Sequence, residues 1–166
     1  MFEPVVDTTL TLLSTVGLPI LFGVFVLKGA IVGKPLPTSV LLPGYVLATS
    51  TAPSNVAVAV LVASVGYVCG QLLIYFGARR GGAAFVRSLP WTSDGRLRRA
   101  ERLFGTYSGA GVFVTNLVPY LGSFVLVPAG LASYPVGRLL VYALSSTLIN
   151  YAGIVLLALG VIELLF

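Results

Sequence analysis

The sequence contains no histidine and only one cysteine, Cys69. A single thiol cannot form a disulfide within the chain, and zinc or haem sites are usually built from histidine or several cysteine ligands. Charged residues are also scarce, at 9% of the 166 residues, and only five of them are acidic. We therefore expect neither a structural disulfide nor a metal or organic cofactor.

The missing residue types also argue against an enzyme. Without histidine, the commonest general base is absent. No carboxylate falls within an inferred hydrophobic segment, because all five lie near segment ends or in one charged loop. The hydroxyls of Thr38 and Ser39 lack a candidate partner that would activate a nucleophile. We expect no catalytic residues.

The chain is instead dominated by apolar sequence. Hydrophobic residues make up 57% of it, and its mean hydropathy is +1.02. This composition is typical of a multi-pass membrane protein, which we expect to be one membrane domain, residues 1–166, in the cell membrane. The N-terminal residues carry no basic stretch, so we expect no cleaved signal peptide.

One apolar stretch, residues 33–50, is interrupted by Pro35, Pro37 and Pro43. Each proline removes a backbone donor and obstructs a continuous helix, and Pro43 is followed by Gly44, which makes a turn-forming pair. Backbone groups freed within lipid must be satisfied by protein or by a water-filled cavity. We therefore predict a broken, re-entrant segment over residues 33–50.

Residues 116–133 repeat this pattern, and we predict a second re-entrant segment over residues 108–133. The breaking residues here are Pro119, Pro128 and Gly130. Paired broken segments in the two halves of a chain are typical of transporters with a site at the membrane midplane. Two proline-kinked but otherwise ordinary spans are the alternative.

Charge-free runs predict three full transmembrane helices, at residues 8–27, 55–78 and 138–162. Together with two re-entrant hairpins arranged as an inverted repeat, they define an all-α, multi-pass membrane fold. Four crossings are the alternative, because the run between Lys34 and Arg79 is just long enough for two helices.

The middle span contains Gly66 and Gly70, a GxxxG spacing that permits close helix packing. Such a seam would lie inside the fold or between the protomers of a homo-oligomer. Chance is an equal alternative, since the chain has 19 glycines.

Seven of the ten Lys and Arg residues lie within residues 79–104. The positive-inside rule places this segment in the cytoplasm, as an amphipathic helix on anionic lipid head groups or as a solvated loop. The aromatic residues do not interleave with the arginines, so nucleic acid is not an expected partner. The arginines of a lipid-binding surface would be Arg79, Arg80, Arg96, Arg98, Arg99 and Arg102.

Polar side chains within the apolar stretches are candidates for a substrate path, because such groups usually face a cavity or the bundle interior. Lys34 is the nearest cation for a phosphate head group, whereas Lys28 is interpreted as snorkelling to the interface. Polar residues of the last span, including Ser146 and Asn150, are expected to hydrogen-bond across helices. The predicted substrate-binding residues are Lys34, Thr38, Ser39, Gln71, Asn116, Tyr120 and Ser123.

Three motifs, in this order and spacing, resemble those of the DedA family of membrane proteins, which carry a VTT domain. Residues 33–42, Gly-Lys-Pro-Leu-Pro-Thr-Ser-Val-Leu-Leu, are similar to a Pro-x-Pro-Gly-Glu/Asp segment. Residues 70–81, Gly-Gln-Leu-Leu-Ile-Tyr-Phe-Gly-Ala-Arg-Arg-Gly, are similar to Gly-Asp-x-x-x-Tyr-x-Gly-x-Arg-x-x-Gly. Residues 113–122, Phe-Val-Thr-Asn-Leu-Val-Pro-Tyr-Leu-Gly, resemble Phe-x-x-Arg-Phe-x-Pro-x-x-Arg, and an Ala-Gly pair follows as in the family.

The resemblance covers about residues 20–155 and implies two facing re-entrant hairpins and translocation of phospholipids or polyprenyl-phosphate carriers, proton-driven in some members. The charged positions differ in this chain. The family's first carboxylate aligns with Ser39, its aspartate with Gln71, and its two arginines with Asn116 and Gly122.

We therefore expect a lipid transporter or scramblase that is not proton-coupled and whose partners are membrane lipids. The alternative is a non-transporting membrane scaffold, a degenerate family member that acts through partner membrane proteins. The neutral residues favour the scaffold, and the proline and glycine framework favours transport.

Overall fold

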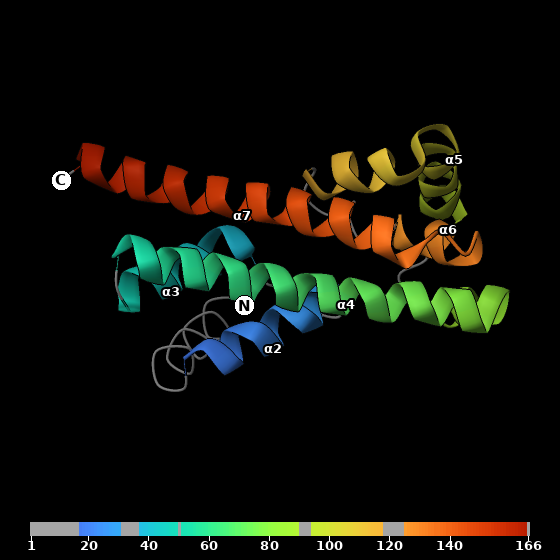
Figure 1. Ribbon diagram of the computed structural model, residues 1–166, viewed down its shortest axis with the longest axis horizontal. Coiled ribbons are helices and arrows are strands. Elements are labelled where there is room, and N and C mark those ends of the chain that lie inside the picture. Colours follow the sequence, from blue (N-terminus) through green and yellow to red (C-terminus); the bar gives the residue numbers. More distant parts are fainter. Residues whose placement is uncertain (1–16, 31–36, 50, 90–93, 118–124, 166) are drawn as a thin grey trace.

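The computed structural model describes residues 17–30, 37–49, 51–89, 94–117 and 125–165 of the chain. Within these residues the protein forms six helices and no strand (Figure 1). The helices are α2 (Leu18–Gly29), α3 (Thr38–Thr49), α4 (Pro53–Ser88), α5 (Asp94–Leu117), α6 (Leu126–Leu131) and α7 (Val136–Leu165). The predicted all-helical class is confirmed.

The two long helices, α4 and α7, lie side by side and run in opposite directions (Figure 1). Each is preceded by two shorter helices. In each half, the first short helix packs on the long helix of its own half: α2 on α4, and α5 on α7. The second packs on the long helix of the other half: α3 on α7, and α6 on α4. The two halves are therefore interlocked through the central pair.

Helices α4 and α7 are also the two that are long and apolar enough to cross a membrane, over Pro53–Ser88 and Val136–Gly160. Helices α4 and α7 contain the whole of the predicted spans 55–78 and 138–162. Of the predicted first span, 8–27, residues 8–16 lie outside the described part, and α2 continues from Leu18 to Gly29.

The close approach of α2 to α4 depends on glycines. A Cβ placed on Gly66 would lie 2.7 Å from the backbone oxygen of Phe22, and one on Gly70 would lie 2.6 Å from the backbone nitrogen of Ala30. Both distances are too short for a side chain, so the helices touch backbone to backbone. The GxxxG pair is a packing seam inside the fold.

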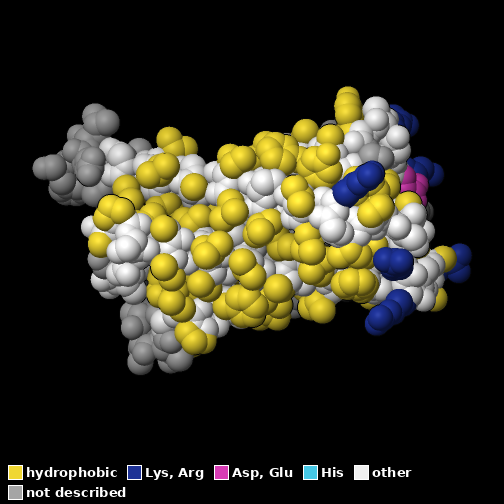
Figure 2. All heavy atoms as spheres, viewed as in Figure 1, with side chains coloured by type: hydrophobic (Ala, Val, Ile, Leu, Met, Phe, Trp, Pro, Cys, Tyr) yellow, Lys and Arg dark blue, Asp and Glu magenta, His cyan; other side chains and the backbone are white. Residues whose placement is uncertain are grey.

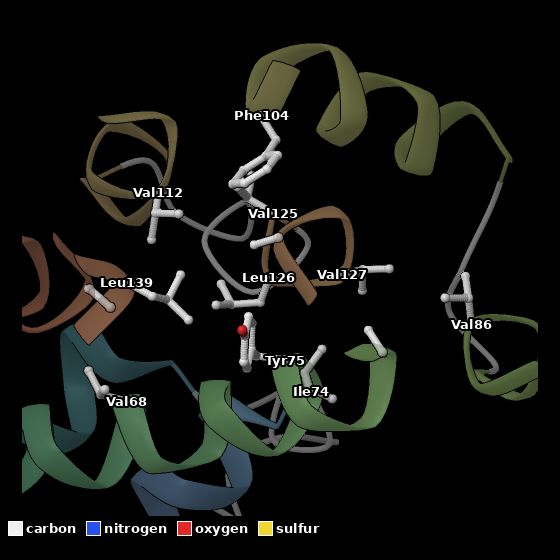
Figure 3. Packing of buried hydrophobic residues seen from close by; sticks show 13 residues of the cluster. Val68, Ile74, Tyr75, Val86, Phe104, Val112, Val125, Leu126, Val127 and Leu139 are labelled. Atoms are coloured by element: carbon white, nitrogen blue, oxygen red, sulfur yellow. The ribbon is translucent and has the colours of Figure 1, made fainter. Parts of the chain in front are cut away.

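The apolar interior forms two clusters, one toward each end of the long helices. One cluster lies where α5 and α6 pack: Tyr75 points from α4 toward Leu126 of α6, and Val112 of α5 and Leu139 of α7 lie around them (Figure 3). The other lies where α2 and α3 pack and includes Phe25.

The predicted turn at Pro43 and Gly44 is not formed, because both residues lie inside the continuous helix α3. Proline removes one backbone hydrogen bond from a helix interior. Here Leu42 on one side of Pro43 and Val46 on the other are fully buried in the second cluster. Their burial offsets the lost bond, so the helix persists. Pro37 lies immediately before α3, and Pro35 lies outside the described residues.

The second predicted segment, 108–133, is described in two parts. Residues 108–117 complete α5, and α6 begins at Leu126. Pro119 falls in the interval between them, outside the described residues. Pro128 does not break α6, because it occupies the first turn of the helix, where a missing donor costs no intrahelical bond.

Helix α6 ends on a tight cap rather than at Gly130. Ser133 takes a positive φ of 50°. The backbone N–H of Tyr134 donates to the carbonyl oxygen of Ala129 (3.0 Å), and that of Ser133 donates to Gly130 (2.9 Å). This is the Schellman arrangement, with serine at the position that usually holds glycine. Gly130 instead allows α6 to lie on α4, since a Cβ there would lie 2.8 Å from the Cβ of Ala78.

The segment 79–104 is not a loop over its first ten residues, because α4 continues through Arg79 and Arg80 to Ser88. The helix is kinked at Gly82, whose φ of 53° and ψ of −142° suit glycine. Beyond the kink, Phe85 folds back, and a Cβ on Gly77 would lie 2.6 Å from its ring. Helix α5 begins at Asp94 and extends beyond the predicted segment 79–104, to Leu117.

Replacing Gly70 with alanine is expected to destabilise the protein by ~1–3 kcal/mol, the usual cost of overpacking, because the new methyl group would meet backbone atoms of α2. Thermal unfolding in detergent measures the change. Gly153 is the matched control: nothing lies within 4 Å of a Cβ placed there, so G153A should be neutral or slightly stabilising. Equal effects of the two substitutions would contradict the packing seam.

Candidate functional site

Two of the shorter helices end halfway along α4. Gly29, the last residue of α2, lies against α4 so closely that a Cβ on it would be 3.0 Å from the backbone nitrogen of Gln71. Asn116, the next-to-last residue of α5, accepts a hydrogen bond from the side chain of Gln71. The ends of α2 and α5 therefore meet α4 at the same residue, close to the middle of the 36-residue helix.

A chain of hydrogen bonds joins α4, α5 and α7 at this level. Gln71 Nε2 donates to Asn116 Oδ1 (2.7 Å), and Asn116 Nδ2 donates to Ser146 Oγ (3.1 Å). Gln71, Asn116 and Ser146 are buried, with 0%, 6% and 0% of their surfaces exposed. We call these residues, with Asn150, the amide network.

The direction of the network follows from Ser146. Its hydroxyl has one proton, and it lies 2.7 Å from the carbonyl oxygen of Tyr142, to which it donates. Ser146 must then accept from the Asn116 amide, which leaves Asn116 Oδ1 to accept from Gln71. The remaining oxygen, Gln71 Oε1, is buried and has no hydrogen-bond partner among the described residues.

Asn150 completes the network by satisfying the end of α5. The last four carbonyl groups of a helix have no partner within it. One of these, the backbone oxygen of Asn116, accepts a hydrogen bond from Asn150 Nδ2 (2.9 Å). This bond satisfies one of those carbonyl groups where the end of α5 meets α7.

The network separates the two apolar clusters. On α7, Leu139 and Ala143 belong to one cluster, and Tyr151 and Val155 belong to the other. Ser146 and Asn150 lie between these pairs, spaced by four residues and so on one face of the helix. A polar layer thus crosses the molecule near the middle of both long helices.

A second polar contact ties α4 to the segment after α6. The hydroxyl of Tyr75 donates to the backbone oxygen of Tyr134 (2.6 Å) and accepts from the Arg79 guanidinium (3.1 Å). Arg80 lies over the ring of Phe76, 5.8 Å from its centre. These contacts hold Arg79 and Arg80 at the start of the basic region. Both arginines are exposed, as are Arg98 and Arg102 later in the same region.

Of the predicted substrate-binding residues, the structure brings Gln71 and Asn116 together. Ser39 is exposed on α3, and of Thr38 only the backbone is described. Lys34, Tyr120 and Ser123 lie outside the described residues, as do the side chains of Arg96 and Arg99.

The predicted set omitted Ser146 and Asn150, although the last span was expected to bond across helices. Their four-residue spacing on one helical face is the signal that identifies them. Their neighbours Ser145 and Thr147 instead donate to carbonyl oxygens of their own helix.

Comparison of the chain with protein-family models, with curated proteins and with solved structures gives no match. Among the described residues, no group of three or more histidine, cysteine, aspartate or glutamate side chains is placed to hold a metal ion.

Replacing Asn116 alone with leucine should destabilise the protein by ~1–3 kcal/mol, because it leaves buried donors and acceptors of its partners unsatisfied. The double variant Q71L/N116L should lose less than the sum of the single variants, because it removes both partners. Thermal unfolding in detergent measures the three values. S145A, which removes a bond confined to α7, is the control and should be near neutral. Strict additivity would argue against the coupling.

Proposed function

We propose that this protein is a multi-pass membrane protein of DedA-like architecture that lets lipids move between the leaflets of a bilayer. The observation that carries the proposal is the ending of α2 and α5 halfway along α4, at the buried amide network. Helices that stop at mid-depth, beside polar side chains, are typical of transporter sites.

The surface supports a location in a membrane. Hydrophobic side chains cover most of the long body, while Lys and Arg gather at one end, where α4 ends and α5 begins (Figure 2). Large apolar residues in the middle of α7 are exposed, including Val141 (68%) and Leu156 (64%). Exposed apolar patches of this extent suit contact with lipid. The stretch from Pro53 to Arg79 measures ~39 Å at 1.5 Å per residue, which exceeds the ~30 Å hydrocarbon core.

The arrangement of the helices supports two re-entrant hairpins. Helices α2 and α3 precede α4, and α5 and α6 precede α7, with matching contacts to the antiparallel long helices. An inverted repeat of shorter helices around a central pair has this pattern. In this proposal the hairpins are α2–α3 and α5–α6; α5 packs on α6, whereas α2 and α3 each pack on the long helices and, among the described residues, not on each other. Helix α2 then belongs to a hairpin rather than to a full span over residues 8–27.

The positions of Gln71 and Asn116 support the DedA resemblance in particular. They align with an aspartate and an arginine of the family motifs, and their side chains are in direct contact at 2.7 Å. An ion pair and an amide pair are two ways of satisfying the same buried contact. Replacing both the aspartate and the arginine by amide residues would keep the contact between the two side chains and remove their charges.

A neutral site suits equilibration of lipids better than pumping. Amide and hydroxyl groups at mid-depth replace part of the hydration that a polar head group loses in hydrocarbon. Without a fixed charge or a titrating carboxylate among Gln71, Asn116, Ser146 and Asn150, they hold it loosely and without proton coupling.

A specific observation favours the second candidate, a membrane scaffold. The side-chain amides of Gln71, Asn116 and Asn150 each already donate one hydrogen bond within the protein. Bonds between helices of this kind also suit a purely structural core.

Crossing by α4 is testable with single cysteines in a protein whose Cys69 is replaced by serine. Cysteines at Thr51 and Ser88, on either side of the candidate span, should be labelled by an impermeant maleimide from opposite faces of the membrane. The cysteine at Ser88 should be cytoplasmic, as the basic end requires. Labelling of both from one face would rule out a spanning α4.

Lipid movement is testable with purified protein in liposomes. Wild-type protein should speed the transbilayer movement of a labelled phospholipid or polyprenyl phosphate without an energy source, and a protonophore should not change the rate. Q71L/N116L should slow it while the protein stays folded, and S145L, which lies outside the network, should not. If wild-type liposomes equilibrate no faster than empty ones, the scaffold becomes the better assignment.

A further inference from the structure

A cation lies next to the amide network, at the end of α2. The ammonium nitrogen of Lys28 is 5.8 Å from the ring centre of Tyr151, 5.9 Å from that of Tyr67 and 6.0 Å from that of Phe25. The rings also pack edge to face, with 5.2 Å between Phe25 and Tyr151. Aromatic faces at this distance attract a cation. Lys28, Phe25, Ser64, Tyr67 and Tyr151 are here called the Lys28 cluster.

The depth of Lys28 differs from the sequence interpretation, which placed it at the membrane interface. Lys28 immediately precedes Gly29, and Gly29 packs against the backbone of Tyr67 and Gln71. Lys28 therefore lies beside the middle of α4, and it is only half-buried. A charged side chain at this depth marks a functional site by default.

Two hydroxyl groups of the cluster add hydrogen-bond donors. Tyr151 is 3% exposed and Ser64 is 0% exposed, and neither hydroxyl has a hydrogen-bond partner within the described parts of the chain. Ser64 precedes Tyr67 by three residues and so shares its face of α4. Buried polar groups without a partner are rare and call for an explanation such as a bound ligand.

The polar groups on the two sides of Gln71 thus differ in whether they donate or accept hydrogen bonds. The amide network presents an unpaired acceptor, Gln71 Oε1. The Lys28 cluster presents an ammonium group and two hydroxyls, all of which donate. Phosphate oxygens accept hydrogen bonds and bind lysine through charge-assisted contacts.

We propose that the Lys28 cluster binds the phosphate of a lipid head group at mid-depth. The proposal rests on the proposed lipid transport, and it assigns the phosphate to Lys28, Tyr151 and Ser64 rather than to Gln71 and Asn116. Lys28, being half-buried, makes the first contact, and the enclosed hydroxyls complete the binding.

The test uses the full-length protein in detergent, with phosphatidic acid as the probe. Thermal unfolding is followed as the lipid is titrated, since a ligand that binds the folded state raises its stability in a saturable way. Diacylglycerol, which lacks the phosphate, and inorganic phosphate, which lacks the lipid, form the other two arms. The variants are Lys28→Met, Tyr151→Phe and, as a matched loss of one positive charge, Arg87→Gln at the exposed end of α4.

Wild-type protein and R87Q should show the same saturable shift with phosphatidic acid and none with diacylglycerol. K28M should raise the half-saturating lipid concentration about tenfold, and Y151F about fivefold. Y151F removes only an unpaired hydroxyl, so it should fold even if K28M does not. A structural role for Tyr151 would change the unfolding temperature without lipid but not the half-saturating concentration.

If K28M binds phosphatidic acid as tightly as the wild-type protein, the proposal is overturned. If K28M does not fold, unchanged binding by Y151F overturns it instead. A shift in unfolding temperature with diacylglycerol equal to that with phosphatidic acid would also overturn the proposal. An equally strong response to inorganic phosphate would overturn it as well, because it would indicate a site for free anions. Binding without transbilayer movement in the liposome assay would count against lipid transport but not against this site.

Discussion

The hydrogen bond between Gln71 and Asn116 is the contact on which the centre of the structure depends. Helix α5 ends at Leu117 against the middle of α4, and Asn116, the residue before the last, is buried there. The side chain of Gln71 donates to that of Asn116 near the end of α5 (Nε2 to Oδ1, 2.7 Å). The side chain of Asn150 donates to the backbone oxygen of Asn116. Without this pairing, a helix end in the interior would leave several polar groups unsatisfied.

A buried contact of this kind can be satisfied by two neutral amides and needs no ion pair. The desolvation penalty of a buried ion pair can exceed its attraction, whereas two amides need only complementary donors and acceptors. Gln71 and Asn116 meet that condition because Ser146 fixes the orientation of Asn116. On α7 the apolar clusters then lie on either side of neutral side chains, Ser146 and Asn150.

The sequence predicts the long helices well and the breaks less well. Charge-free runs locate α4 and α7 because length and hydropathy alone decide whether a helix is long enough to span. The role of Pro43 was misjudged because burial on both sides of it, which only tertiary packing provides, outweighs one lost backbone bond. The extension of α4 beyond Arg79 depends on Phe85 covering Gly77 after the kink at Gly82, a contact that no periodicity reveals.

Only part of the candidate site could be predicted from the sequence, because side-chain contacts between distant residues are not visible in it. A polar residue in an apolar run is visible in the sequence, so Gln71 and Asn116 could be selected, although their separation of 45 residues hides that they touch. The depth of Lys28 is not decided by the sequence, because a lysine at the end of a charge-free run is ambiguous. It marks an interface if the helix spans, but mid-depth if the helix stops halfway.

Helices α2 and α5, whose C-terminal ends meet α4 near Gln71, differ in the side chains found at those ends. Each C-terminus carries a partial negative charge from its free carbonyl groups. At α5 a neutral amide, Asn150, donates to the carbonyl. At α2 the basic residue of the last turn, Lys28, supplies a full positive charge among three aromatic rings. The two helix ends that meet α4 near Gln71 therefore differ in charge: the last turn of α2 carries a lysine, whereas the end of α5 is met by a neutral amide.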